Sequence, residues 1–80
     1  QKIIFYPNPA SRDQPIHWVL EQGVAASSSL QLFDISGRML VNYNELPPTI
    51  DIRQFQPGMM IYKLLDTAGQ VISTGKLIVL

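Results

Sequence analysis

Hydrophobic residues recur at every second position through most of the chain, and this pattern constrains the possible folds more than any other feature. An alternation of period two places apolar side chains on one face of a β-strand and polar side chains on the other. Ile16, Trp18 and Leu20 thus share one face of an expected strand, and His17 lies on the opposite face. Because no segment shows the helical period of an amphipathic helix, we predict an all-β protein. The expected strands are residues 3–6, 14–21, 29–33, 38–43, 49–52, 60–64 and 70–80.

About seven short strands separated by turn signals predict a β-sandwich of mostly antiparallel strands. The chain has 80 residues, of which 46% are hydrophobic and 15% are charged. It is therefore long and apolar enough to bury one core, and we expect a single domain over residues 1–80. Residues 23–28 show no clear alternation, and we interpret them as a loop or as one helical turn.

Charge and residue types argue against several classes of function. Six basic and six acidic residues cancel and are scattered singly, which argues against binding to nucleic acid or to a lipid headgroup surface. With no cysteine and one histidine, neither a disulfide nor a zinc site is expected. No carboxylates are paired at short spacing, no Gly-rich phosphate loop is present, and His17 is interpreted as an exposed strand residue. We therefore expect no catalytic residue, no metal, no cofactor and no enzymatic activity.

One turn pattern occurs twice. An aspartate at the first turn position accepts hydrogen bonds from backbone N–H groups two residues on, and a glycine at the fourth supplies the positive φ that such a turn needs. Asp34 with Gly37, and Asp66 with Gly69, fit these two positions. We therefore predict the same hairpin in two segments, 30–40 and 62–72.

Two prolines separated by one asparagine follow the first expected strand. Each proline fixes its own φ, removes a backbone donor and keeps the residue before it extended. Pro7, Asn8 and Pro9 therefore predict a rigid exit from a short edge strand.

Four stretches in this order resemble the C-terminal sorting domain of the type IX secretion system of Bacteroidota, type A, also called the Por secretion tail. The resemblance covers nearly the whole chain. The stretches are YPNPAS (6–11), LQLFDISGRML (30–40), IDIRQFQPGMMIYKL (50–64) and GKLIVL (75–80).

The resemblance implies an Ig-like sandwich at the C-terminus of an exported cargo protein. It implies recognition by the type IX translocon and its outer-membrane shuttle protein, after transit through the periplasm. It also implies, for many cargoes, removal of the tail by a sortase-like cysteine peptidase, which joins the cargo to lipopolysaccharide at the outer-membrane surface; other cargoes become extracellular. Because the chain starts at Gln1 without methionine, we expect a piece of a larger protein.

The resemblance also implies candidate residues for translocon recognition. They are Pro7, Asn8, Pro9, Asp34, Gly37, Arg38, Gly58, Lys76, Leu77, Ile78, Val79 and Leu80. Each candidate except Arg38 can also be explained by a structural role in place of recognition. These roles are to end a strand, to form a turn or to occupy a core strand. We expect the terminal strand to leave an unpaired edge, which a partner extends by β-augmentation or a second copy uses to form a dimer.

Two other functions remain open from the residues alone. The first is an Ig-like adhesion or carbohydrate-binding module, for which Trp18, Phe33, Phe55 and Tyr62 are the aromatic candidates for a stacking platform. Trp18 and Phe55 are expected in the core instead, because a small sandwich needs large apolar side chains there. The second is a small hydrolase, for which no residue set is apparent.

Overall fold

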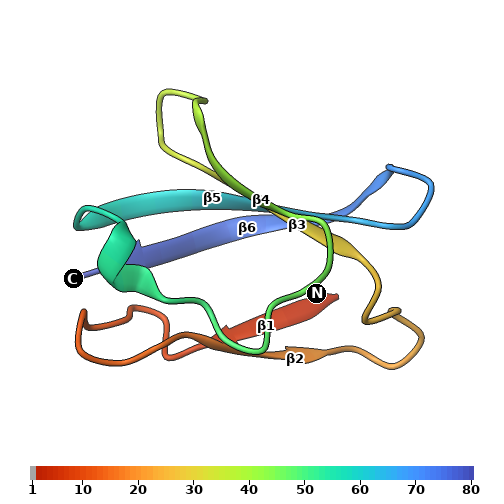
Figure 1. Cartoon of the computed structure of the whole chain (residues 1–80), viewed down its shortest axis with the longest axis horizontal. Helices are drawn as coiled ribbons and strands as arrows, with labels where there is room; N and C mark the ends of the chain where they lie inside the picture. Colours follow the sequence, from red (N-terminus) through yellow and green to blue (C-terminus); the bar gives the residue numbers. More distant parts are fainter. Residues whose placement is uncertain (1) are drawn as a thin grey trace.

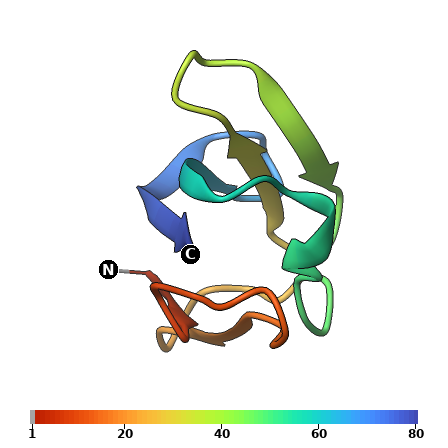
Figure 2. The ribbon, with the colours of Figure 1, turned by 90° about the vertical axis from the view of Figure 1, so that its left-hand side faces the viewer.

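The computed structural model describes residues 2–80 and is a sandwich of two antiparallel sheets, which confirms the predicted fold class. The smaller sheet pairs β1 (Ile3–Tyr6) with β2 (His17–Leu20). The larger sheet has the strand order β4-β3-β5-β6. Figures 1 and 2 show the two sheets as separate layers. The strands of the larger sheet are β3 (Ser29–Phe33), β4 (Met39–Tyr43), β5 (Gly58–Leu65) and β6 (Val71–Val79).

The core lies between the two sheets, and the predicted alternation defines which side chains enter it. Met60, Tyr62 and Leu64 of β5 are buried, while their neighbours along the strand face outward. Phe5 of β1 meets the Tyr62 ring edge to face, with ring centroids 4.9 Å apart. The remaining buried apolar residues come from both layers and from the loops: Ile3, Ala10, Ile16, Leu30, Leu32, Ile50, Ile52, Phe55, Leu77 and Val79.

The prediction of a strand over residues 49–52 is wrong. Ile50 makes an isolated antiparallel bridge with Ile16, and the chain then enters a short 3-10 helix, η1 (Ile52–Gln54). The Asp51 side chain accepts a hydrogen bond of 3.0 Å from the backbone N–H two residues on and thereby caps this helix. Ile50 and Ile52 are both buried. The alternation of the segment therefore predicted the burial of its isoleucines correctly, but it predicted a strand where the backbone forms a helix.

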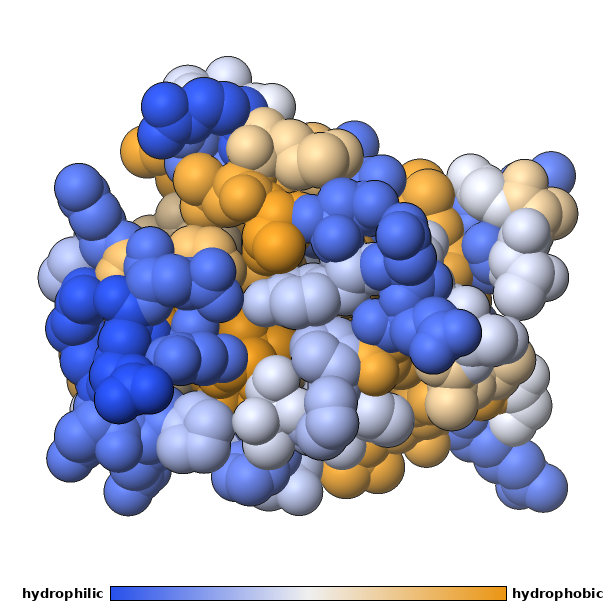
Figure 3. Space-filling model, viewed as in Figure 1, coloured by the Kyte–Doolittle hydropathy of each residue, from blue (hydrophilic) through white to orange (hydrophobic). Residues whose placement is uncertain are grey.

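Loops from distant parts of the chain gather at one end of the sandwich. In Figure 1 the left end carries the loop that joins β1 to β2, the helix η1 and the C-terminal end of β6. This loop starts with Pro7 and Pro9, whose preceding peptide bonds are both cis. Figure 3 shows that the end over this loop and η1 is hydrophilic, whereas hydrophobic residues gather over β4 and the adjoining part of β5.

Gly75 permits the close packing of β6 against β5. It pairs with Tyr62 in the register of the two strands, and a Cβ atom at this position would lie 2.5 Å from Cε2 of the Tyr62 ring. The ring can therefore lie against the β6 backbone only because position 75 has no side chain.

We expect Gly75→Ala to destabilise the fold by about 1 to 3 kcal/mol, because the added methyl displaces a buried ring. Urea unfolding measures this loss, with Thr74→Ala on the outward side of β6 as the control. The loss should shrink in a Tyr62→Leu background. An equal loss in both backgrounds would show that the ring is not its cause.

Candidate recognition surface

Residues 8–10, which we call the edge segment, run along the outer edge of β6. The Asn8 carboxamide donates a 2.9 Å hydrogen bond from Nδ2 to the Lys76 carbonyl, and its Oδ1 accepts one of 3.0 Å from the Ile78 N–H. Ala10 continues the contact: its N–H donates to the Ile78 carbonyl at 2.8 Å, and its carbonyl accepts from the Leu80 N–H at 2.8 Å. A side chain and a backbone together thus replace a neighbouring strand.

This contact corrects the prediction of an unpaired edge at the end of the chain. From the Lys76 carbonyl to the Leu80 N–H, the outward backbone groups of β6 already have partners in the edge segment. A partner strand cannot pair there without displacing Asn8 and Ala10. Alternate residues of an edge strand point their backbone N–H and C=O groups to the same side. Thr74 therefore points these groups to the same outer edge as Lys76 and Ile78, and the part of this edge that remains open is centred on Thr74.

The terminal stretch presents two sets of side chains. Leu77 and Val79 are buried in the core, so the structural alternative holds for these two candidates. Lys76, Ile78 and Leu80 are exposed and face outward. Only these three are available to contact a partner through their side chains.

The turn between β3 and β4 is built around Asp34. Its Oδ1 accepts from the backbone N–H of Ser36 and of Arg38, each at 3.0 Å, and from the Ser36 hydroxyl at 2.6 Å. Gly37 has the predicted positive φ of 93°. The Arg38 guanidinium lies 3.2 Å from Asp34 Oδ2, so Arg38 has a local structural role that the sequence did not suggest.

The turn between β5 and β6 repeats this arrangement, as predicted from the repeated pattern. Asp66 Oδ1 accepts from the N–H groups of Ala68 and Gln70 at 3.0 and 2.9 Å, and Gly69 has a φ of 85°. The two turns differ in chemistry, because the second lacks the serine hydroxyl and the arginine of the first. Only the first turn therefore carries an ion pair.

A groove of about 440 Å³ adjoins the first turn and gathers three of the candidate residues. Asp34, Arg38 and Gly58 all line it, while Gly58 also pairs with Val79 in the register of β5 and β6. Gly58 thus lies between the turn candidates and the terminal stretch. The other candidates do not line the groove. Its apolar wall is formed by Ile35, Leu40, Phe55, Pro57, Met59 and Met60.

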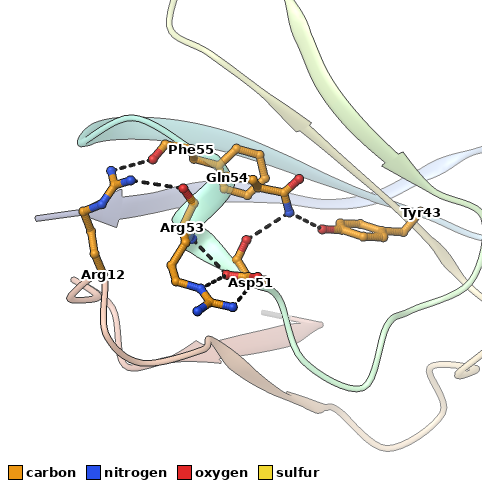
Figure 4. A network of polar contacts seen from close by, with 6 residues as sticks. All are labelled: Arg12, Tyr43, Asp51, Arg53, Gln54 and Phe55. Atoms are coloured by element: carbon orange, nitrogen blue, oxygen red, sulfur yellow. Dashed lines mark hydrogen bonds and ion pairs between the residues drawn. The ribbon is translucent and has the colours of Figure 1, made fainter.

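Arg12 holds the β1–β2 loop against η1, and sequence reasoning missed it. Its guanidinium donates to the carbonyls of Phe55 at 2.7 Å and Arg53 at 3.0 Å (Figure 4). Arg53 in turn pairs with Asp51, at 3.0 Å from Nε to Oδ1. No signal in the sequence predicts these contacts, because carbonyl acceptors have no side-chain signature.

The four candidate aromatic residues do not form an exposed stacking platform together. Phe55 and Tyr62 are buried in the core, and Trp18 is partly buried with its indole N–H donating to the Pro47 carbonyl. Phe33 lies beneath the Lys63 ammonium, which is 4.9 Å from the ring centroid. The predicted core role is confirmed for Phe55, while Trp18 is partly buried and packs against the core.

The described residues contain neither a metal-binding cluster nor a membrane-spanning helix. Among residues 2–80 no group of histidine, aspartate or glutamate side chains is arranged to hold a metal ion. In the same range no helix is long and apolar enough to cross a membrane.

Residues 4–80 match the family model described as a secretion system C-terminal sorting domain. Because the match covers nearly the whole chain, the chain belongs to this family, the Por secretion tails of type IX secretion. Members are sorting signals rather than a class of enzymes, and such a signal marks a protein for secretion or for the cell surface. No curated protein and no solved structure shows a significant match to the chain.

We expect Asn8→Ala to lower the free energy of unfolding by about 1 to 2 kcal/mol, because two hydrogen bonds to β6 are lost. Urea unfolding of the domain measures the effect. Asn42→Ala is the control, since the exposed Asn42 side chain donates its hydrogen bond to the nearby Asn44 side chain and not to a distant strand. It should cost no more than about 0.5 kcal/mol. Equal effects of the two substitutions would contradict a structural role for Asn8.

Hydrogen bonding at the first turn holds the pKa of the Asp34 carboxyl below its ordinary value of 3.8, chiefly through the Ser36 hydroxyl and then the Arg38 N–H. Because the folded-state pKa is depressed, ionised Asp34 stabilises the fold above that ordinary value. This contribution is lost as the pH falls through the folded-state pKa. We expect Ser36→Ala to raise the pKa of Asp34, as measured by NMR titration of its carboxyl carbon. The pKa of Asp51, which its own contacts with Arg53 lower, should stay unchanged as the internal control.

Proposed function

We propose that residues 1–80 are the C-terminal sorting domain of a larger exported protein and direct the attached cargo across the outer membrane through the type IX translocon. The observation that carries this proposal is the family match over residues 4–80. The geometry supports it, because the motifs quoted from the two ends of the chain lie side by side in the edge segment and β6. A partner can therefore read both motifs at one place.

The proposed recognition surface has two parts. One is the end of β6 with the edge segment, where Lys76, Ile78 and Leu80 are exposed beside Asn8 and Pro9. The other is the groove next to the Asp34 turn. Because the edge of β6 is closed over residues 76–80, we propose that side chains are read there and that β-augmentation is not the mode of recognition at this end.

The later steps of the route are part of the same proposal. The tail passes through the periplasm, meets the outer-membrane shuttle protein and translocon, and is removed by a sortase-like cysteine peptidase that joins the cargo to lipopolysaccharide. The place of β1 in the fold supports a cleavage site on the N-terminal side of this strand, because Ile3 and Phe5 belong to the core. A dimer through a strand edge would use β4, the other outer strand of the larger sheet.

The experiment is export of a periplasmic reporter fused to residues 1–80, behind an N-terminal signal peptide, in a bacterium with a type IX system. We expect the reporter outside the cell in the wild type and in the periplasm of a translocon mutant. Lys76→Glu should reduce export several-fold without unfolding the domain, whereas Lys2→Glu, an exposed lysine at the start of the smaller sheet, should not.

Periplasmic retention in both strains, with the domain folded, would overturn the sorting function. Unfolding of the Lys76→Glu domain would count against a direct role of Lys76 in recognition. Its effect on folding is measured by thermal unfolding of the isolated variant before export is scored.

A further inference from the structure

The outer face of the four-stranded sheet carries a continuous row of side chains across all its strands. The strand register places Met39, Phe33, Ile61 and Lys76 next to one another, from β4 through β3 and β5 to β6. Phe33, Ile61 and Lys76 alternate with buried positions, so they point away from the core. Met39 follows a β-bulge in the register of β3 and β4 and is exposed beside Phe33. The row connects the β4 edge with the terminal stretch.

A second pair extends this apolar surface towards the end of the sandwich. Met59 of β5 is opposite Ile78 of β6 on the same outer face. Met39, Met59 and Ile78 expose 46%, 40% and 37% of their surface. Exposure on this scale over neighbouring strands is a contiguous patch and not a set of single apolar residues, which marks a contact surface.

The charge on this face is of one sign, although the whole chain is neutral. The strands of the larger sheet contain two charged residues, Lys63 and Lys76, and no acidic residue. Both lysines face outward, and neither forms an ion pair within residues 2–80. By contrast, Arg38 and Arg53 are each paired with a carboxylate. The acidic residues of the chain all lie outside these strands, at positions 13, 21, 34, 45, 51 and 66.

These observations favour a protein partner over a lipid surface. Two lysines near an anionic membrane supply only about 1 kcal/mol each, which is too little for stable binding. The outward positions of the sheet also lack the tryptophan and tyrosine that anchor proteins at a membrane interface, since Tyr43 and Tyr62 face the core. A flat apolar surface with two fixed positive charges instead complements an apolar protein surface that carries carboxylates.

We propose that the outer face of the four-stranded sheet, centred on Ile61 and flanked by Lys63 and Lys76, docks an apolar, acidic surface of a partner protein. The inference rests on the proposed sorting function in that Lys76 and Ile78 belong to both surfaces. It extends that function by naming the face and the chemistry of the partner. The partner is recognised through side chains, because the edge of β6 is closed at residues 76–80.

Photo-crosslinking in cells tests this surface independently of export. A photoreactive benzoylphenylalanine replaces Met59 or Met39 in the reporter–tail fusion, and the control position is Gln22, an exposed polar residue in the turn that follows β2. We expect a crosslinked protein at both methionine positions, in roughly ten-fold higher yield than at Gln22, for a docked partner. The crosslinked peptide should contain aspartate or glutamate.

A charge series tests the role of the lysines. Lys63→Glu combined with Lys76→Glu should lower the crosslink yield at Met59 by roughly ten-fold, because two attractive contacts become repulsive. The matched pair Lys63→Arg and Lys76→Arg should keep most of it. The comparison of crosslink yields at Met59 and Met39 uses tails that retain both lysines. A folding defect of the glutamate variant therefore does not decide whether the docking face exists.

Several results would overturn the proposal. They are equal yields at Met59, Met39 and Gln22, a lipid adduct, a crosslink to a second copy of the tail, or a partner surface without carboxylates. Export is scored in the same cells and separates the two claims. Crosslinks at the methionines without export support the docking face and contradict the sorting function. Export without such crosslinks supports the sorting function and contradicts the docking face.

Discussion

The hydrogen bonds between Asn8 and the backbone of β6 are the constraint on which the arrangement of the functional end depends. Asn8 binds Lys76 and Ile78, which lie 68 and 70 residues further along the sequence. It uses the nitrogen of its carboxamide for one hydrogen bond and the oxygen for the other. Ala10 completes the contact through its backbone. The result is that the start of the chain covers the edge of the last strand. An exposed edge of that length would otherwise be open to pairing with other chains.

Closure of this edge changes how the sorting signal is to be understood. A terminal strand with a free edge would be read through its backbone, by addition of a strand. With residues 76–80 already paired, the information lies in outward side chains, and the four-stranded sheet provides a face on which Lys76 and Ile78 continue into Ile61 and Met59. Arg12 supports the same end by tying the β1–β2 loop to η1. The functional end is thus held by contacts between segments that are distant in sequence.

The local features of the fold were predictable from the sequence, and the long-range ones were not. Period-two alternation identified the strands and the buried faces of β2 and β5, and the repeated Asp-x-x-Gly pattern predicted two turns that share their hydrogen bonds. The prediction of a strand over residues 49–52 failed because Asp51 caps a 3-10 helix there. The alternation in this segment consists of two isoleucines, which is too short to favour strand pairing over the capped helix. For the site, the candidate residues were named by resemblance, but the pairing of Asn8 with β6 has no local signal.

Amide hydrogen exchange along β6 tests the closed edge most directly. The N–H groups of Ile78 and Thr74 point towards the same outer edge, but only Ile78 has a partner there, the Oδ1 of Asn8. The account predicts strong protection of Ile78 and weak protection of Thr74 in the folded domain. Exchange of Ile78 as fast as that of Thr74 would contradict it, because the edge of the last strand would then be open and available for strand addition.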